Sequence, residues 1–218
     1  MRKAQRSVKT LGTAISIVPY EGAYLFACAE YELAIRELVE EFADSVHRKV
    51  KRFEQLDSKL QKRHLEQSAA ILTELHHDRF RSSGLTELQI VQRLLLCLDP
   101  STPDNGYALN QEAISYCRNN FDWKTLKAIF HDLGITELID KVVTRQGLRD
   151  ALGGLSEGQA KNALILELDG MMLTRNRIIH RNGAPFSPSN SEVRRASNVL
   201  EELVLSLHSV LLRHYRGL

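Results

Sequence analysis

The chain has 218 residues, of which 43% are hydrophobic and 26% are charged, so it can close a folded core and is not expected to be disordered. Its 29 basic residues nearly balance its 27 acidic ones, and the net charge of +2 argues against a protein that coats nucleic acid with its whole surface. The three cysteines form no CxxC pair, which argues against a disulfide framework or a zinc module and favours a reducing compartment such as the cytoplasm.

No segment predicts a membrane span or a signal peptide. The longest apolar stretch, residues 23–29, ends at Glu30, whereas a helix needs roughly 20 apolar residues to cross a bilayer. The basic amino terminus is followed by a short apolar run that ends at Pro19 without a small-residue cleavage site. We therefore expect a cytoplasmic protein that does not bind a membrane.

Apolar residues recur every three or four positions along nearly the whole chain, and the alternation typical of strands is missing, so we expect an all-α fold. The first helix is expected to be long, starting after Pro19 and Gly22 and running to about Gln55. Its first half is acidic and its second half is basic, a distribution that the helix dipole favours.

The middle of the chain is expected to consist of shorter helices. They are predicted over 58–79, 87–98, 111–119 and 123–133, with Asp122 capping the last of them and Gly134 closing it, and a further one starting near Thr136. The turn residues between 101 and 107 form the clearest internal boundary. Four glycines lie in 146–158 without the spacing of a phosphate-binding loop, so this segment is predicted to be a connector.

Two helices are expected at the carboxyl end. The penultimate helix can start at Ser156, where Gln159 completes a capping box, and runs to about Arg181 before Asn182 and Gly183 end it. After the loop at 184–189, a final amphipathic helix is predicted to pack on the rest of the fold.

Most enzyme signatures are missing from the sequence, including GxSxG, the Walker loop, HExxH and the EF-hand loop. Adjacent His76 and His77 would point to different sides of a helix and lack a third ligand at a suitable spacing. We therefore expect neither a metal nor another cofactor.

Residues 174–183 differ from the rest because they combine a histidine and arginines at a predicted helix end. His180 there would be partly exposed and able to transfer protons near neutral pH, and Arg175 offers a planar fork that matches phosphate oxygens. The surrounding segment, 171–195, contains five arginines and one acid, which gives a local net charge of +4. A basic patch is therefore predicted here.

Arg175-Asn176, three variable residues and His180, on the penultimate helix of an all-α chain, resemble the signature of the HEPN superfamily. The layout is similar to the RiboL-PSP type: a long acidic first helix, a variable middle, the Arg-Asn helix and an amphipathic closing helix. The resemblance covers 19–55 and 156–216 well and is looser between 82 and 150. Many relatives have glycine directly after the histidine, where this chain has Arg181-Asn182.

This resemblance implies a single HEPN-like helical bundle over 1–218, with an amino-terminal arm at 1–20 and inserted, variable middle helices at 82–150. It also implies a metal-independent endoribonuclease, usually a toxin or an effector of antiviral defence. Such an enzyme would act on RNA as a homodimer whose motifs face each other. An antitoxin or another protein of a defence system would be a possible partner.

The resemblance assigns catalysis to two residues, with His180 transferring protons and Arg175 contacting the phosphate. Asn176 would orient His180 or bind RNA, and Arg177 or Arg181 would position the RNA backbone. An acidic residue of the first helix, Glu30 or Glu32, is a further candidate as the partner of Arg175. Residues five apart on a helix point about 140° apart, so Arg175 must reach round to His180 or act from the opposing subunit.

Two alternatives remain open from the sequence. An arginine-rich helix end with a terminal histidine also results from plain compensation of the helix dipole. A second possibility is a non-catalytic HEPN-like dimer that binds RNA, a nucleotide or a protein. Four aromatic residues could stack on bases, although such spacing is more typical of a core: Tyr24, Tyr31, Tyr107 and Trp123.

Overall fold

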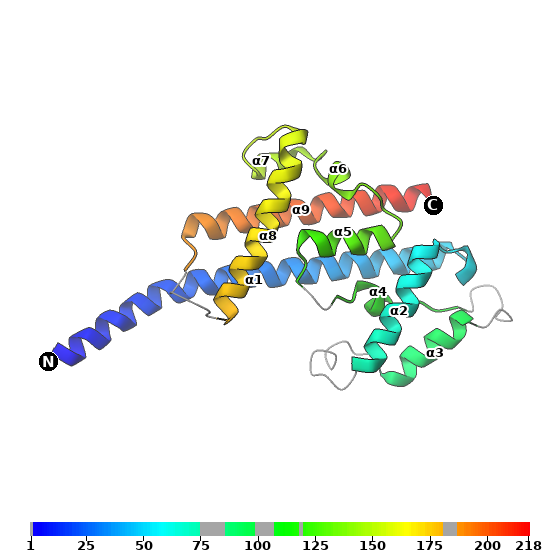
Figure 1. The fold of residues 1–218 in the computed structure, drawn as a ribbon, viewed down its shortest axis with the longest axis horizontal. Helices are drawn as coiled ribbons and strands as arrows, with labels where there is room; N and C mark the ends of the chain where they lie inside the picture. Colours follow the sequence, from blue (N-terminus) through cyan, green and yellow to red (C-terminus); the bar gives the residue numbers. More distant parts are fainter. Residues whose placement is uncertain (1, 75–85, 99–106, 118–119, 181–186) are drawn as a thin grey trace. The chain divides into compact units, whose positions relative to one another are not determined.

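The computed structural model describes residues 2–74, 86–98, 107–117, 120–180 and 187–218, and for residues 2–19 and 74 it describes the backbone alone. Within these ranges the chain forms helices and connecting segments, with no strand (Figure 1), so the all-α prediction is confirmed. The bounds of the helices are α1 Arg2–Lys49, α2 Ser58–Glu74, α3 Glu87–Leu98, α4 Gln111–Ser115, α5 Trp123–Asp132, α6 Leu138–Val142, α7 Gln146–Ala151, α8 Glu157–His180 and α9 Asn190–Gly217, with a 3-10 turn at Phe53–Gln55.

The chain divides into two compact units. Unit 1 comprises Met1–Leu33 and Ile139–Leu207, and unit 2 comprises Ala34–Leu138 and His208–Leu218. Helices α1 and α9 each contribute to both units, and α8 belongs to unit 1 alone. The organisation of 1–218 as one HEPN-like domain stays a prediction.

The first helix is long, as predicted, but both of its expected ends were wrong. It begins at Arg2, so residues 2–20 are helical and continuous with the rest of α1. Pro19 and Gly22 weaken a helix, through one lost backbone hydrogen bond and greater backbone freedom, and here they do not end it. The helix ends at Lys49 because Arg52 takes an extended conformation and the chain turns to bury Phe53.

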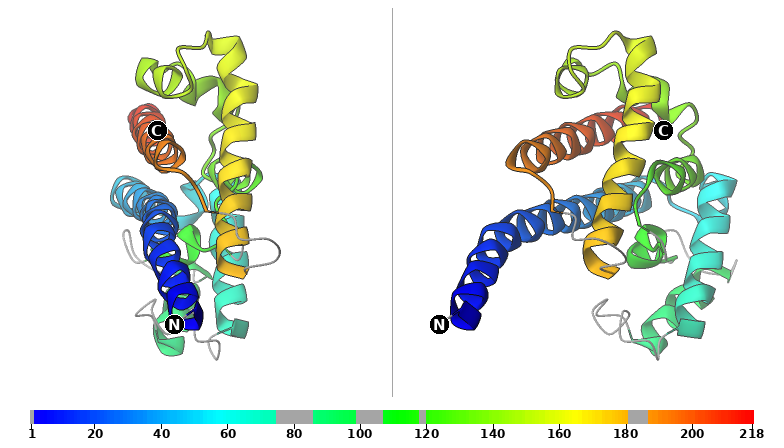
Figure 2. Two further views of the ribbon diagram at one scale, coloured as in Figure 1. Left: turned by 90° about the vertical axis from the view of Figure 1, so that its left-hand side faces the viewer. Right: turned by 60° about the vertical axis from the view of Figure 1, so that its left-hand side comes forward.

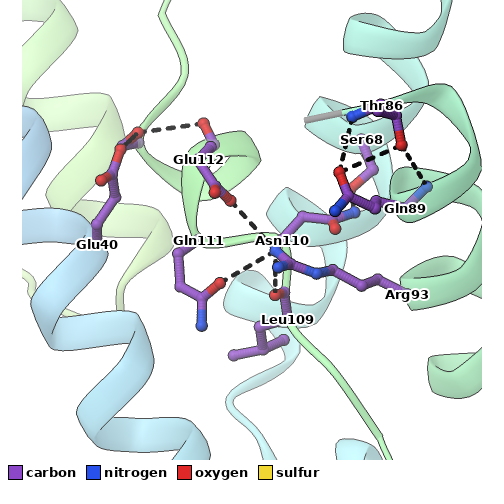
Figure 3. A network of polar contacts seen from close by, with 10 residues as sticks. Glu40, Ser68, Thr86, Gln89, Arg93, Leu109, Asn110, Gln111 and Glu112 are labelled. Carbon is purple, nitrogen blue, oxygen red and sulfur yellow. Dashed lines mark hydrogen bonds and ion pairs between the residues drawn. The ribbon is translucent and has the colours of Figure 1, made fainter. Parts of the chain in front are cut away.

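Helices α2 to α5 form much of the apolar core of unit 2. The four aromatic residues noted in the sequence are all buried, Tyr107 and Trp123 in unit 2 and Tyr24 and Tyr31 in unit 1, as expected of core residues. Polar groups tie the segment before α4 to its neighbours: Arg93 on α3 donates to the carbonyl of Leu109 and to the side chains of Gln111 and Glu112, and Asn110 donates to Ser68 (Figure 3).

Helix α3 has the predicted bounds, while α4 ends earlier than predicted because Tyr116 adopts an extended conformation. Helix α5 is capped as expected: Asp122 accepts a hydrogen bond from the backbone N–H of Thr125 at 2.8 Å. Gly134 has φ +84°, a left-handed conformation that glycine adopts without strain, directly after this helix. The predicted end of the second helix, 75–79, and most of the predicted loop, 101–106, lie outside the described residues.

The segment 146–158, which was predicted to be a connector, contains a helix that was not predicted, α7, in its first part. Leu148 is buried, and Gln146 donates a hydrogen bond to Asp150 one turn later at 2.6 Å. The helix ends before Gly153 and Gly154, which both have positive φ.

The last two helices begin close to where the sequence predicts. Gln159 accepts hydrogen bonds from the N–H and hydroxyl of Ser156 at the start of α8, and Glu192 accepts the same pair from Ser189 at the start of α9. Both arrangements satisfy backbone donors that the first helical turn leaves unpaired. None of the helices within the described residues combines the length and apolar character needed to cross a bilayer.

Candidate active site

Helix α8 has one buried face and one exposed face. The buried face is apolar and consists of Ala160, Leu164, Leu168, Met171, Met172 and Ile178. The exposed face carries Leu166, Gly170, Leu173, Arg177 and His180, which follow one another at intervals of three and four residues. His180 therefore lies at the end of an exposed stripe, in the last turn of the helix.

Arg175 lies on the flank of α8 that faces α1. Its Nε atom is 3.8 Å from Oε1 of Glu32, and its Nη1 donates a 3.2 Å hydrogen bond to the side-chain oxygen of Asn176. The side chains of Arg175 and Glu32 are only 25% and 19% exposed, so this ion pair is partly shielded from water. Within unit 1, the carboxyl end of α8 stays beside α1 in each view (Figure 2).

The α1 surface behind this ion pair is tightly packed. Tyr24, Cys28 and Glu32 are spaced by four residues and so share one face of α1. Cys28 is fully buried, and burial raises the pKa of its thiol to about 11, although the charge of nearby Arg175 acts in the opposite direction. Burial also raises the pKa of Tyr24, to about 12, and the Tyr24 side chain forms a hydrogen bond with Thr174.

The structure thus brings together Arg175, Asn176 and Glu32 among the residues singled out in the sequence. Glu30, the other acidic candidate, is exposed on α1. Arg177 is exposed on the same face of α8 as His180. Arg181 lies outside the described residues, so its predicted role in positioning RNA has no structural counterpart here.

The predicted basic patch is weaker than the sequence indicates, because acidic residues from other parts of unit 1 pair with its arginines. Glu32 pairs with Arg175, and Glu167 binds Arg195 through two contacts of 2.7 and 2.9 Å. Arg194 donates to Asn190 on its own helix instead. The positive charge left on this surface is therefore concentrated in fewer residues than the sequence count implies.

A cavity of about 230 Å³ lies beside the motif, between α1, α8 and α9, and is lined entirely by residues of unit 1. Its walls are formed by Tyr24, Leu166, Glu167, Gly170, Met171, Thr174, Pro188, Glu192, Arg195 and Ala196. The sequence analysis did not identify this cavity. One signal in the sequence was Gly170. A glycine inside a helix lowers the stability of the helix by about 1 kcal/mol relative to alanine, so its presence can mark a position where a side chain would fill a cavity.

The described residues contain no group of three or more His, Cys, Asp or Glu side chains placed to hold a metal ion. The three cysteines, which all lie in the described ranges, form no disulfide. The metal-free chemistry inferred from the sequence stays a prediction.

An all-helical fold whose penultimate helix ends in Arg175-Asn176-xxx-His180 defines a protein of the HEPN class. A family model, RiboL-PSP-HEPN, matches residues 9–213, which is nearly the whole chain and includes the middle segment where the resemblance was looser. The chain belongs to the RiboL-PSP-HEPN family. Comparisons with curated proteins and with solved structures found no significant match.

Proposed function

We propose that this protein is a metal-independent endoribonuclease. The observation that carries the proposal is the end of α8, where the shielded Arg175–Glu32 pair and Asn176 lie one turn before the exposed His180. Membership of the RiboL-PSP-HEPN family supports a function related to RNA or nucleotides. The cleavage chemistry and the residue roles are the proposal.

RNA suits this small set of groups because it carries its own nucleophile, the 2′-hydroxyl. His180 accepts the proton of the 2′-hydroxyl as its oxygen attacks the phosphorus and then donates that proton to the leaving 5′-oxygen, and its exposed position at the end of α8 gives RNA access to the imidazole. Arg175 stabilises the negative charge that develops on the phosphate. The products are then a 2′,3′-cyclic phosphate and a 5′-hydroxyl.

Glu32 acts as a positioning residue in this scheme. A carboxylate oxygen 3.8 Å from Nε restricts the rotamers of Arg175. The hydrogen bond to Asn176 fixes the same side chain from a second direction. The arginine is therefore pre-organised before a phosphate binds, which lowers the ordering cost of binding.

A homodimer would complete the site. Arg175 faces the α1 side of α8, whereas His180 lies on the exposed face, and residues five apart on a helix point about 140° apart. The exposed face also presents Leu173, which is 52% exposed and lies in the carboxyl-terminal half of the helix. A second copy packed on the carboxyl-terminal part of this stripe would bury Leu173 and bring two motifs together across a two-fold axis.

The test is incubation of the purified protein with total RNA in EDTA, with mapping of the ends of any fragments. Wild type should produce 2′,3′-cyclic phosphate ends, while H180A and R175A should produce none. H131A and R213A are matched controls, because His131 and Arg213 are exposed residues outside the site. A thermal collapse of the H180A protein would instead support a purely structural role for this histidine.

The second candidate is a dimeric HEPN-like module that binds RNA, a nucleotide or a protein without cleaving. The partly neutralised basic patch favours binding of a nucleotide or a protein, since arginines paired with Glu32 and Glu167 attract an RNA strand less strongly. Intact RNA with a well-folded wild-type protein would support this candidate. A role as a toxin or defence effector, an antitoxin partner and the cytoplasmic location also stay predictions; toxicity would make wild type harder to express than R175A.

A further inference from the structure

The cavity between α1, α8 and α9 has the mixed character of a site for one flat, polar ring. Leu166, Met171, Pro188 and Ala196 supply apolar surface, and Glu167, Glu192 and Arg195 supply charge. Its volume of about 230 Å³ lies below the range of about 300–1,000 Å³ typical of drug-sized ligands, so it suits a single small group.

The charged groups in the wall have fixed positions. Arg195 donates to Glu167 through both Nε and Nη2, and this contact raises the pKa of the arginine further. Glu192 accepts hydrogen bonds from the backbone and the hydroxyl of Ser189, which hold the pKa of its carboxyl below the ordinary value. Acceptors and donors therefore line the same cavity in positions held by hydrogen bonds.

Among the four RNA bases, guanine matches both kinds of group. Its Watson–Crick edge presents two adjacent donors, the N1–H and the 2-amino group, which one carboxylate can accept together. Its other edge presents two acceptors, O6 and N7, which an arginine can bind through Nη1 and the second N–H of Nη2 while Nε and Nη2 stay in contact with Glu167. Adenine and cytosine present a single amino donor group, and uracil presents a single ring N–H. Each of these bases therefore forms fewer hydrogen bonds with the charged groups that line the cavity.

The cavity lies close to the proposed catalytic residues along the same helix. Thr174 in its wall precedes His180 by six residues, which corresponds to about 9 Å along the helix axis. Arg177 lies one turn beyond Thr174 and is exposed on the side of α8 that leads from the cavity to His180. Neighbouring nucleotides of one strand can span this separation.

We propose that this cavity binds one guanine base of a single-stranded RNA next to the bond that is cut. The role in cleavage rests on the proposed endoribonuclease function, whereas guanine binding itself does not. The cavity therefore determines base specificity, and His180 and Arg175 determine reactivity.

Binding is tested on the wild-type protein with the 3′-monophosphates of guanosine, adenosine, cytidine and uridine, by calorimetry. We expect the guanosine compound to bind at least tenfold more tightly than the other three, and R195A to lose this preference. R194A is the matched control: it removes the same charge one residue away, from a side chain outside the cavity wall. Equal binding of all four compounds, or no binding, would overturn the proposal.

A second variant, G170L, adds bulk at the cavity wall. A Cβ atom at Gly170 meets no atom within 4 Å, so the substitution should preserve the fold, and leucine favours the helix more than glycine does. We expect G170L to lose guanosine binding while its melting temperature stays equal or rises. Light scattering on every variant separates this effect from a changed oligomeric state. Retained guanosine preference in both G170L and R195A would place the ligand elsewhere and overturn the proposal.

The cleavage experiment separates this proposal from the one on which it rests. Mapped ends from wild type should cluster beside guanine, and R195A should cut with a changed base distribution at a rate within about tenfold of wild type. Cleavage without base preference would overturn the proposed guanine site and would still support the proposed endoribonuclease function. Selective, Arg195-dependent guanosine binding without any cutting supports the guanine site and contradicts the endoribonuclease.

Discussion

Arg63 in unit 2 is a buried arginine and Arg175 in unit 1 a partly buried one, and the structure holds the two side chains differently. The guanidinium of Arg63, a residue that is 5% exposed, donates to the carbonyls of Ile114 and Tyr116 at 2.7 and 3.0 Å and to Asp132 at 3.0 Å. Arg175 has a carboxylate at 3.8 Å and a hydrogen bond to its sequence neighbour, Asn176.

The difference indicates a structural role for Arg63 and is compatible with the proposed contact of Arg175 with a phosphate. Arg63 fixes the carbonyls at the end of α4, and these short bonds match its planar fork, so moving it would leave buried acceptors unsatisfied. The 3.8 Å contact between Arg175 and Glu32 is too long for a hydrogen bond, so this ion pair holds its guanidinium less tightly than the short bonds hold that of Arg63.

The largest effect on stability is expected at Arg63. R63A should lower the free energy of unfolding by about 3–5 kcal/mol, because it leaves Asp132 and two carbonyls without their buried partner. Chemical denaturation measures the change, with the exposed R213A as the control. A loss of unfolding free energy under about 1 kcal/mol would show that the hydrogen bonds of Arg63 do not make it a structural residue.

The second prediction concerns Arg175, where the larger effect is expected on activity and the smaller one on stability. R175A should reduce RNA cleavage by about 10²–10³-fold, which corresponds to the loss of one charge-stabilising group, while it lowers the unfolding free energy by less than R63A does, because its 3.8 Å contact with Glu32 is looser than the bonds of Arg63. Initial rates on a labelled RNA and a melting curve of the same sample provide both values. Similar stability losses in R175A and R63A would show that both arginines are structural.

A third prediction uses His64, which is fully buried in unit 2 against the ring of Phe53. Burial, and to a smaller extent Arg93, lowers the pKa of His64 to about 4 from 6.5. Between these two values the unfolded chain binds a proton that the folded chain does not, so stability falls as the pH falls. The shift corresponds to about 3 kcal/mol between pH 6.5 and pH 4.

The measurement compares denaturation at several pH values in wild type and H64L. The variant should lose most of this pH dependence, whereas H131L, at a mostly exposed histidine, should keep it. Identical slopes in wild type and H64L would show that His64 does not resist protonation in the fold. The comparison shows whether unit 2 can bury a charge that lacks hydrogen-bond partners, since the buried charge of Arg63 is fully hydrogen-bonded.

The smallest expected effect is at the cap of α5. D122A removes the acceptor of the Thr125 N–H bond and should cost about 1 kcal/mol, while D122N should cost less because asparagine also caps helices. Thermal unfolding in parallel with R63A would rank a local cap against a long-range network in the same unit. Equal losses in D122A and D122N would indicate that the charge, rather than the hydrogen bond, is important.

Local signals in the sequence predicted the fold well. Asp122 and Gly134 delimit α5, and the Ser156–Gln159 capping box starts α8 where it was expected. The amino terminus was less predictable, since Pro19 is a strong local signal that did not end the helix. Helix α7 was missed because glycines on both sides of a buried leucine look like a connector in the sequence alone.

The site was predictable only in part, because its geometry depends on contacts between distant residues. The sequence named both Glu30 and Glu32 as partners for Arg175, and the helical face decides between them. Glu32 shares the face of Tyr24 and Cys28, which packs on α8, whereas Glu30 is exposed. The cavity could not be predicted, since it requires α1, α8 and α9 to meet around Gly170.

The buried thiols of this protein provide one internal reporter in each unit. Cys28 lies in unit 1 behind the Arg175–Glu32 pair, Cys97 lies buried in unit 2, and burial raises both pKa values to about 11. Only the thiolate reacts readily with alkylating reagents, so each cysteine is labelled chiefly when its own surroundings open. The labelling rates of Cys28 and Cys97 therefore measure separately how often each unit opens, without any engineered cysteine.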